Sequence, residues 1–289
     1  MRRLAELTEL APLHNKPALT AIAEARRLLP RVPHVAVFDT AFHSTIPAEA
    51  STYALPQRLR EDFGIRRYGF QGLSVQWASE RVQVGRLVVC HLGGGCSVTA
   101  VRNGRSLDTT MGFTPLEGVP MATRAGSVDP GALLHLLRHG LTVDELEHAL
   151  EQESGLLGLS GSSADVRELE QADDEPARLA LEVLCYRVAG AVAAMTTILG
   201  GLDGLVFTAG IGENSAGIRA GICGRLRPVG VELDKAANAS ARPDAEVGRE
   251  GAPVRVFVIR AREDLIAARE ARALLGLAAQ RMPNDAYGL

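Results

Sequence analysis

Residues 88–98 read Val-Val-Cys-His-Leu-Gly-Gly-Gly-Cys-Ser-Val, and this stretch limits the possible folds more than any other. An apolar run, three glycines and a second β-prone run predict a strand, a tight turn and a returning strand. Because glycine has no Cβ, such a turn lets a ligand approach bare backbone N–H groups, as in phosphate-binding loops. An ordinary hairpin with a glycine-rich turn fits the same residues, so the rest of the chain must decide.

Composition narrows the class of protein. The chain has 289 residues, of which 46% are hydrophobic and 22% charged, as expected for a globular protein with one large domain or two. A net charge of -3 lacks the basic excess of nucleic-acid binders. We find no uninterrupted apolar run long enough to span a bilayer, and an acidic residue interrupts any signal-peptide core near the start. Four cysteines without Cys-x-x-Cys spacing predict buried, reduced thiols in a cytoplasmic protein rather than a zinc site.

The N-terminal third supplies a first candidate site residue. Apolar residues at helical spacing over 4–29 are interrupted by prolines within 11–17, which predicts two helices with His14 and Asn15 in the connection. Residues 35–38 predict a short buried strand that ends at Asp39. Ligands gather at the carboxyl ends of strands in α/β sheets, which makes Asp39 a candidate. Capping of the following turn explains this carboxylate equally well.

The middle of the chain adds basic residues in loops. Arg66 and Arg67 lie beside aromatic residues and glycines, where they would either hold an anion or form a solvated pair. An Asn103-Gly104 turn continues the antiparallel strands, and a long loop follows over 108–130. Within that loop Arg124 stands alone among small residues, which suits bidentate contact with phosphate or carboxylate.

The C-terminal half repeats the strand–glycine pattern. Helices are predicted over 130–139 and 142–154, and then over 177–199, which is apolar nearly all round and so indicates deep burial or a subunit interface. A strand over 205–208 leads into a Gly-x-Gly turn and a helix N-terminus, which can place N–H groups against nucleotide phosphate. A last strand covers 254–259. Glu263 then begins a helix, a position that the helix dipole alone would favour.

These loops supply what phosphoryl transfer needs. Three glycine-rich turns at strand ends offer donors for phosphate oxygens, an isolated arginine offers a cation, and carboxylates could position Mg²⁺. We therefore expect a phosphate site with metal ligands nearby.

Seven segments make this expectation specific: 11–17, 38–43, 66–72, 91–95, 123–130, 161–167 and 207–214. Their order and spacing resemble acetate kinases and their propionate and butyrate relatives, over nearly the whole chain. The resemblance implies an α/β fold of the ribonuclease-H-like, two-domain kind that acetate kinases share with sugar kinases, actin and heat-shock ATPases. We expect residues 40–263 to form the complete second domain, with 1–39 and 264–289 as remnants of a truncated first domain.

The resemblance also assigns roles, residue by residue. Asp39 corresponds to the carboxylate near the attacking oxygen, Arg124 to the cation on the transferred phosphoryl group, and Glu263 to the magnesium-associated glutamate. Further positions match the second phosphate loop (His91, Gly93, Gly94, Gly95), the adenosine pocket (Asp165, Val166, Arg167, Gly210, Ile211, Gly212, Glu213, Asn214) and the pocket for the substrate's alkyl group (Leu13, Phe70, Pro115). It implies ATP and Mg²⁺, a short-chain carboxylate or acyl phosphate, and a homodimer with no nucleic-acid or membrane partner.

Three positions depart from the family pattern. Gln71 stands where the family has a histidine that contacts the transferred phosphoryl group, Gly94 replaces an asparagine, and Ser127 replaces an acidic residue. The family's opening strand, its Asn-x-Gly-Ser-Ser-Ser turn and its first-domain substrate arginine have no counterpart in this sequence. We therefore expect a kinase that is weak or inactive as this chain alone. The alternatives are a non-catalytic nucleotide-binding or dimerising remnant, and a start that is not the natural one.

Overall fold

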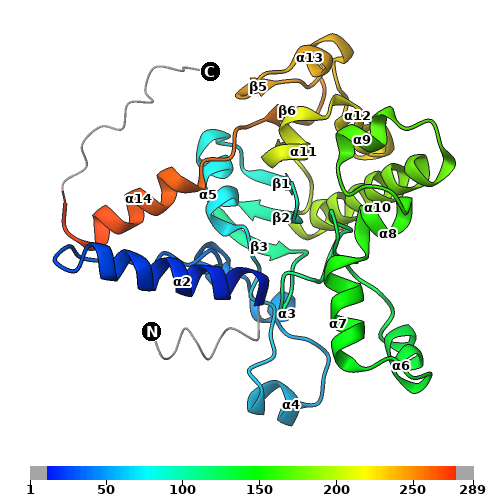
Figure 1. Ribbon diagram of the computed structural model, residues 1–289. Helices are drawn as coiled ribbons and strands as arrows, with labels where there is room; N and C mark the ends of the chain where they lie inside the picture. The colour runs from blue at the N-terminus through cyan, green and yellow to red at the C-terminus, as the bar shows by residue number, and fades with distance from the viewer. Residues whose placement is uncertain (1–11, 278–289) are drawn as a thin grey trace.

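A six-stranded mixed sheet forms the centre of the computed structural model, which describes residues 12–277, with side chains from residue 17 onward (Figure 1). Its strands run in the order β3-β2-β1-β4-β6-β5, and β1, β4 and β6 are parallel to one another while the others pair antiparallel. The strands are β1 (Arg86–Leu92), β2 (Cys96–Arg102), β3 (Arg105–Thr109), β4 (Gly204–Thr208), β5 (Ala245–Glu246) and β6 (Arg255–Val258).

The glycine-rich stretch forms the expected hairpin. Leu92 pairs with Cys96 across the three glycines, so β1 and β2 are joined by a minimal turn. Both faces of these strands are covered: β1 is nearly all apolar, and β2 alternates apolar residues with the buried Ser97 and Thr99. The next turn has positive φ at Asn103 (50°) and Gly104 (75°), as a two-residue hairpin requires.

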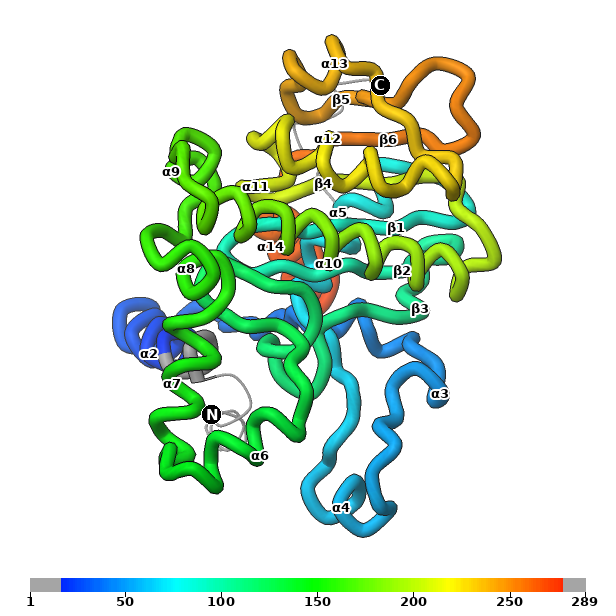
Figure 2. The backbone as a smooth tube through the Cα atoms, turned by 90° about the vertical axis from the view of Figure 1, so that its right-hand side faces the viewer, coloured from blue at the N-terminus to red at the C-terminus, as the bar shows by residue number. Residues whose placement is uncertain are grey.

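Helices cover the sheet on both faces. On one face lie α10 (Glu175–Leu199), α8 (Gly155–Ser160), α9 (Val166–Gln171) and α12 (Ala216–Arg225); Figure 2 looks onto α10 with the strands behind it. On the other lie α5 (Gly72–Arg81) and α14 (Glu263–Leu274), which are joined by an ion pair between Arg269 and Glu80. The remaining elements are α2 (Pro12–Leu28), η2 (Ala41–Thr45), α3 (Ala48–Ser51), α4 (Gln57–Asp62), α6 (Pro130–Arg138), α7 (Val143–Gln152), α11 (Ala209–Asn214), η3 (Arg227–Val229) and α13 (Lys235–Ser240).

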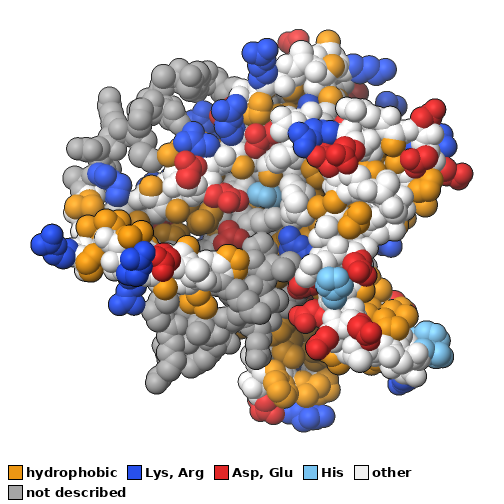
Figure 3. All heavy atoms as spheres, in the orientation of Figure 1, with side chains coloured by type: hydrophobic (Ala, Val, Ile, Leu, Met, Phe, Trp, Pro, Cys, Tyr) orange, Lys and Arg blue, Asp and Glu red, His pale blue; other side chains and the backbone are white. Residues whose placement is uncertain are grey.

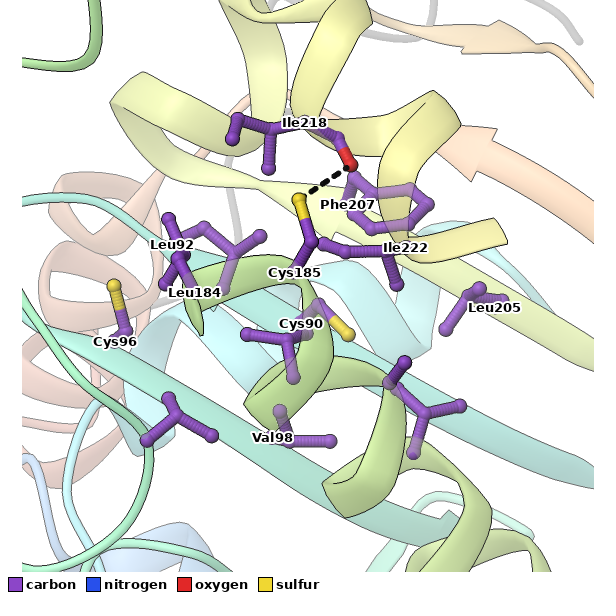
Figure 4. Packing of buried hydrophobic residues seen from close by; sticks show 14 of the residues in the cluster. Cys90, Leu92, Cys96, Val98, Leu184, Cys185, Leu205, Phe207, Ile218 and Ile222 are labelled. Carbon is purple, nitrogen blue, oxygen red and sulfur yellow. Dashed lines mark hydrogen bonds between the residues drawn. The ribbon is translucent and has the colours of Figure 1, made fainter. Parts of the chain in front are cut away.

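The larger of two apolar clusters lies between the sheet and α10, and all four cysteines are buried and unpaired there (Figure 4). Burial raises the pKa of Cys96 to about 11 and that of Cys223 to about 12, so both thiols stay neutral at ordinary pH. The prediction of buried, reduced cysteines is confirmed.

Helix α10 combines a buried side with apolar residues on its outer side. Ten of its residues are buried, whereas Leu179, Tyr186 and Ile198 are 50%, 65% and 42% exposed. Within the described range it is the one helix that has the length and composition to cross a membrane. Glu182 and Arg187 interrupt its apolar run, and its buried side packs on β1 and β2.

Three local predictions were wrong. The helix break at 11–17 is absent: α2 runs from Pro12 through Pro17, with His14 and Asn15 inside it. Pro12 stands at the first helical position, where a proline costs no hydrogen bond, whereas Pro17 lies inside the helix and removes one backbone donor. Residues 35–38 form no strand, and Phe38 is 50% exposed. A strand needs a partner, and the described residues offer these four none. The Gly-x-Gly turn after β4 is part of a short helix, α11.

The loops and capping signals followed expectation more closely. Thr142 caps α7 in a reciprocal arrangement with Glu145, and the chain from 110 to 129 contains no helix or strand. On the face shown in Figure 3, hydrophobic side chains gather where α2 and α14 end, and exposed leucines account for them (Leu28, Leu29, Leu274, Leu275, Leu277). The boundary between two domains stays a prediction.

Candidate active site

The parallel strands bring three predicted segments to one edge of the sheet. β1 ends at the glycines 93–95, β4 ends at α11, and β6 ends five residues before Glu263. Because β1, β4 and β6 run in the same direction, their carboxyl ends lie along one edge, where α/β proteins bind ligands.

The glycine loop packs against the long loop that carries Arg124. Ala122 N donates to Gly94 O at 3.2 Å, and Gly93 N donates to Gly95 O at 3.0 Å. A Cβ at Gly95 would lie 2.6 Å from Arg124 Nη2, closer than real Cβ contacts, and 3.0 Å from Gln71 Nε2, which is a tight contact. A side chain at residue 95 would therefore push the ends of the arginine and the glutamine away from this loop.

Arg124 is a buried cation. Its side chain is 8% exposed, and Nη1 donates to the carbonyl of Pro115 at 2.8 Å. No ion pair joins it to a carboxylate within the described part of the chain. Burial lowers the pKa of this guanidinium, which still carries its charge at neutral pH. A desolvated cation with spare donors is suited to phosphate.

Asp39 caps α5 and at the same time fixes Gln71. Its Oδ2 accepts from Gln71 N at 2.5 Å, and its Oδ1 accepts from Leu73 N at 3.4 Å. Gln71 has φ 62°, in the left-handed region. A Cβ at Gly72 would lie 2.3 Å from the Asp39 carbonyl, so Gly72 is also required for this turn. The expected cap of the following turn is absent, since η2 has Thr40 as its N-cap and no side-chain cap bond, and Asp39 instead accepts from the start of α5. Its role as a site residue stays a prediction.

Glu263 is a second carboxylate near Asp39. Burial raises its pKa, and the negative charges of Asp39 and Asp264 raise it further. A buried carboxylate whose charge is disfavoured by a neighbouring carboxylate fits a divalent cation, which would relieve the repulsion. Among the described residues no group of three or more His, Cys, Asp or Glu side chains could hold a metal alone. This donor set suits Mg²⁺, which keeps its waters and takes one or two carboxylates together with substrate phosphates.

His91 lies beside the loop as a neutral ring. Its Nδ1 is 2.8 Å from Ser74 Oγ, and burial lowers its pKa to about 4. Next to it in the register is Thr208, whose hydroxyl is buried without a partner. His91 therefore places an uncharged hydrogen-bonding group at this edge of the sheet.

The segment predicted to bind adenosine has several side chains engaged internally. Asp165 caps α9 by accepting from Arg167 N at 2.9 Å, and its contacts with the Arg167 guanidinium lower its pKa to about 2. Val166 is buried in the core. Ser215 Oγ donates to Glu170 at 2.6 Å, which ties α9 to α12.

Side chains of helix α11 are likewise engaged in hydrogen bonds within the protein. Glu213 Oε1 accepts from the N–H groups of Ala209 at 3.0 Å and Ala261 at 2.8 Å, and Asn214 Nδ2 donates to Gly210 O at 2.8 Å. Glu213 and Asn214 thus shape the segment rather than reach outward. Gly210 has open space where a Cβ would point, while Gly212 packs on the backbone of Phe207 and Ile211 lies against the core.

The predicted alkyl pocket is only partly described. Phe70 packs against the core, and its carbonyl accepts from His43 Nε2 at 2.9 Å. Pro115 is buried next to Arg124. Leu13 lies in α2, but its side chain is outside the described part of the structure.

Sequence reasoning missed two residues and misjudged a third. Arg219 is 1% exposed and donates to the carbonyls of Gly212, Glu213 and Asn238, so it fixes the end of α11. Ser97 bonds Gln71 from β2. No local sequence pattern marks either residue, because an arginine in a helix and a serine in a strand are common. Arg67 is not a free anion binder: it donates to carbonyls of 109–111 and pairs with Glu117.

Comparison with known proteins identifies the family. The family model described as "Acetokinase family" matches residues 1–269. The chain belongs to this family. An acetate kinase of Synechococcus sp. (strain JA-2-3B'a(2-13)) is 47% identical over 285 residues, which cover 95% of this chain and 70% of that protein. The acetate kinase of Gloeobacter violaceus is 50% identical over 278 residues, which cover 92% of this chain and 68% of that protein.

Solved acetokinase structures share the fold. The Porphyromonas gingivalis acetate kinase superposes with a TM-score of 0.88 at 36% identity, covering 95% of this chain and 72% of that one. A propionate kinase from Francisella tularensis superposes with a TM-score of 0.88 at 39% identity, covering 93% of this chain and 72% of that one. The predicted α/β fold of the acetate kinases is confirmed, and so is a phosphotransferase with a carboxyl-group acceptor. The truncation of the first domain stays a prediction.

The glycine loop yields a first prediction. We expect Gly95→Ala to lower phosphotransfer by about 10²-fold or more, because the new methyl group displaces Arg124 and Gln71 from their shared position. Gly224→Ala, in α12 with open space around its Cβ, is the matched control and should keep full turnover with equal or greater stability. Equal activities of the two variants, measured beside their unfolding midpoints, would contradict this account of the loop.

Proposed function

We propose that this protein transfers the γ-phosphoryl group of ATP to a short-chain carboxylate, with acetate as the first candidate, and gives ADP and an acyl phosphate. The main support is that the Arg124 guanidinium and the Gln71 amide meet over the bare Gly95, beside the carboxylates Asp39 and Glu263. These are the donors and ligands that a transferred phosphoryl group requires.

In the proposed reaction a carboxylate oxygen attacks the γ-phosphorus, and the bond to the β–γ bridging oxygen breaks. The acceptor is already ionised, so no proton has to be removed. Arg124, buried and cationic, holds the equatorial oxygens as negative charge redistributes. Asp39 and Glu263 would hold Mg²⁺, which neutralises charge on the nucleotide phosphates. α11 and α9 would position the nucleotide at the neighbouring strand ends.

The level of activity is part of the proposal. The curated relatives extend beyond the matched region, since this chain covers 70% and 68% of two of them. The donors that the family resemblance places in its first phosphate loop are not supplied by this sequence, and each such donor commonly contributes ~10²-fold. We therefore propose weak or no turnover for this chain alone, in the cytoplasm. The choice among acetate, propionate and butyrate stays open.

A hydroxamate assay with ATP, Mg²⁺ and acetate or propionate tests this function. We expect slow acyl phosphate formation that falls a further ~10²-fold in Arg124→Ala, because the buried cation on the phosphoryl group is lost. Arg138→Ala, at the exposed end of α6, is the control and should match the parent chain. Turnover that is unchanged in Arg124→Ala would refute the proposed role. Calorimetry with Mg²⁺-ATP separates the alternative: binding without any turnover favours a non-catalytic nucleotide-binding remnant.

Gly94 allows a gain-of-function prediction. The resemblance places an asparagine here, and a Cβ at Gly94 would meet nothing within 4 Å. We expect Gly94→Asn to improve kcat/KM for ATP about 3- to 10-fold by adding one side-chain donor to the loop. Gly224→Asn, at an equally open glycine on α12, controls for a general effect of the substitution on the fold. A loss of affinity in Gly94→Asn would show that the loop needs a bare residue there.

We further propose a homodimer that covers the outer face of α10. Leu179, Tyr186 and Ile198 expose apolar surface on this helix, and small residues between them permit close approach. Sedimentation velocity should give about twice the 30.7 kDa chain mass, and Tyr186→Glu should shift the protein to monomer by burying a charge in the interface. Arg138→Glu, which introduces the same residue at the exposed end of α6, is the control. A monomeric parent chain would contradict the dimer.

A further inference from the structure

The side-chain amide of Gln71 is held by a residue from the glycine hairpin. Ser97 Oγ donates to Gln71 Oε1 at 2.6 Å. Ser97 is fully buried on β2, two residues after Gly95, so its hydroxyl has little freedom to seek other partners. The hairpin therefore supplies both the bare loop and the group that orients the amide beside it.

Ser97 determines which end of the amide faces the loop. Because the hydroxyl occupies Oε1, the NH₂ group points the other way, and Nε2 lies 3.0 Å from the position that a Gly95 Cβ would take. Arg124 Nη2 lies 2.6 Å from that same position. A neutral donor and a cationic donor thus converge on one face of Gly95.

The backbone of Gln71 is fixed as firmly as its side chain. It has left-handed φ (62°), and its N–H donates to Asp39 at 2.5 Å. A glutamine gains nothing locally from this conformation, which favours glycine or asparagine. Its contacts at both ends, to Asp39 and to Ser97, hold the residue in place.

We propose that Ser97 is a positioning residue for phosphoryl transfer, which directs the Gln71 amide NH₂ toward an oxygen of the transferred phosphoryl group. This inference rests on the proposed function. Ser97 itself touches no substrate and acts only through Gln71. The carboxamide adds a donor without adding charge, so Arg124 remains the one protein cation over Gly95 within the described residues.

A double-mutant cycle tests this proposal by its non-additivity. We expect Ser97→Ala to lower kcat about 10-fold with little change in KM for ATP, because the amide is no longer oriented for the transition state. In a Gln71→Ala background the same change should have no further effect. Ser97→Thr, which keeps the hydroxyl, should restore most of the rate. If the fold-losses in kcat of the two single variants simply multiply in the double variant, the proposal is overturned.

Thr99→Val is the matched control on the same strand. Thr99 is as buried as Ser97 and its hydroxyl lies 2.8 Å from that of Thr109, so its removal tests the general cost of losing a buried hydroxyl from β2. We expect its unfolding midpoint to fall as much as that of Ser97→Ala while kcat stays at the parent value. An equal fall in kcat for both variants would assign Ser97 a purely structural role.

A second readout does not depend on turnover. The protein is labelled with ¹⁵N in its glutamine side chains for NMR. The NH₂ signals of Gln71 are the ones that disappear in Gln71→Ala. Inorganic phosphate should shift these signals in the parent chain and in Thr99→Val, and should fail to do so in Ser97→Ala. If the parent chain makes no acyl phosphate, the proposed function fails while this titration still judges the Ser97 inference. Unshifted Gln71 signals in the parent chain would refute it.

Discussion

The candidate site depends on one missing atom, the Cβ that residue 95 lacks. Arg124 comes from a loop of some twenty residues without regular structure, and Gln71 comes from the turn before α5. The ends of these two side chains converge on the space over Gly95, where a Cβ would push both of them aside. The hairpin in turn owes its place to the pairing of β1 with both β2 and β4, which buries the strands on both faces. The residues that pair the strands therefore also set the position of the loop in the candidate site.

Capping and chemistry are not competing explanations in this molecule. Asp39 accepts two N–H groups at the start of α5 and still lies close enough to Glu263 to raise its pKa. Glu213 performs a similar structural task at α11. A carboxylate held by backbone donors is preorganised, so the contacts that would make it an ordinary cap also fix it for ligand binding.

How much could be predicted from the sequence follows from the range of the interactions. The Asn103-Gly104 turn and the Thr142 capping box depend on neighbours within four residues, and both were found. Residues 35–38 were misjudged because a strand is defined by a partner, which local β-propensity cannot supply. The roles of Ser97 and Arg219 depend on partners 26 and 19 residues away, through Gln71 and Asn238. Their residue types carry no signal for such contacts. Family resemblance located the loops, but it could not show which side chains are engaged internally.

Backbone strain bears on whether the site is functional or a remnant. Among the described residues, three non-glycine residues have positive φ, and one of them, Asn103, serves a hairpin turn. The other two, Gln71 and Ala209, lie within the segments 66–72 and 207–214, which are proposed to bind the phosphoryl group and the nucleotide. Each left-handed non-glycine residue costs about 1 kcal/mol or more, and such strain persists where surrounding contacts enforce it. Here Asp39 and Ser97 enforce it at Gln71, and Glu213 enforces it at Ala209. Strained positions that surrounding contacts enforce occur mainly at ligand-binding and catalytic sites, so these two positions support the proposed phosphate site over an ordinary pair of turns.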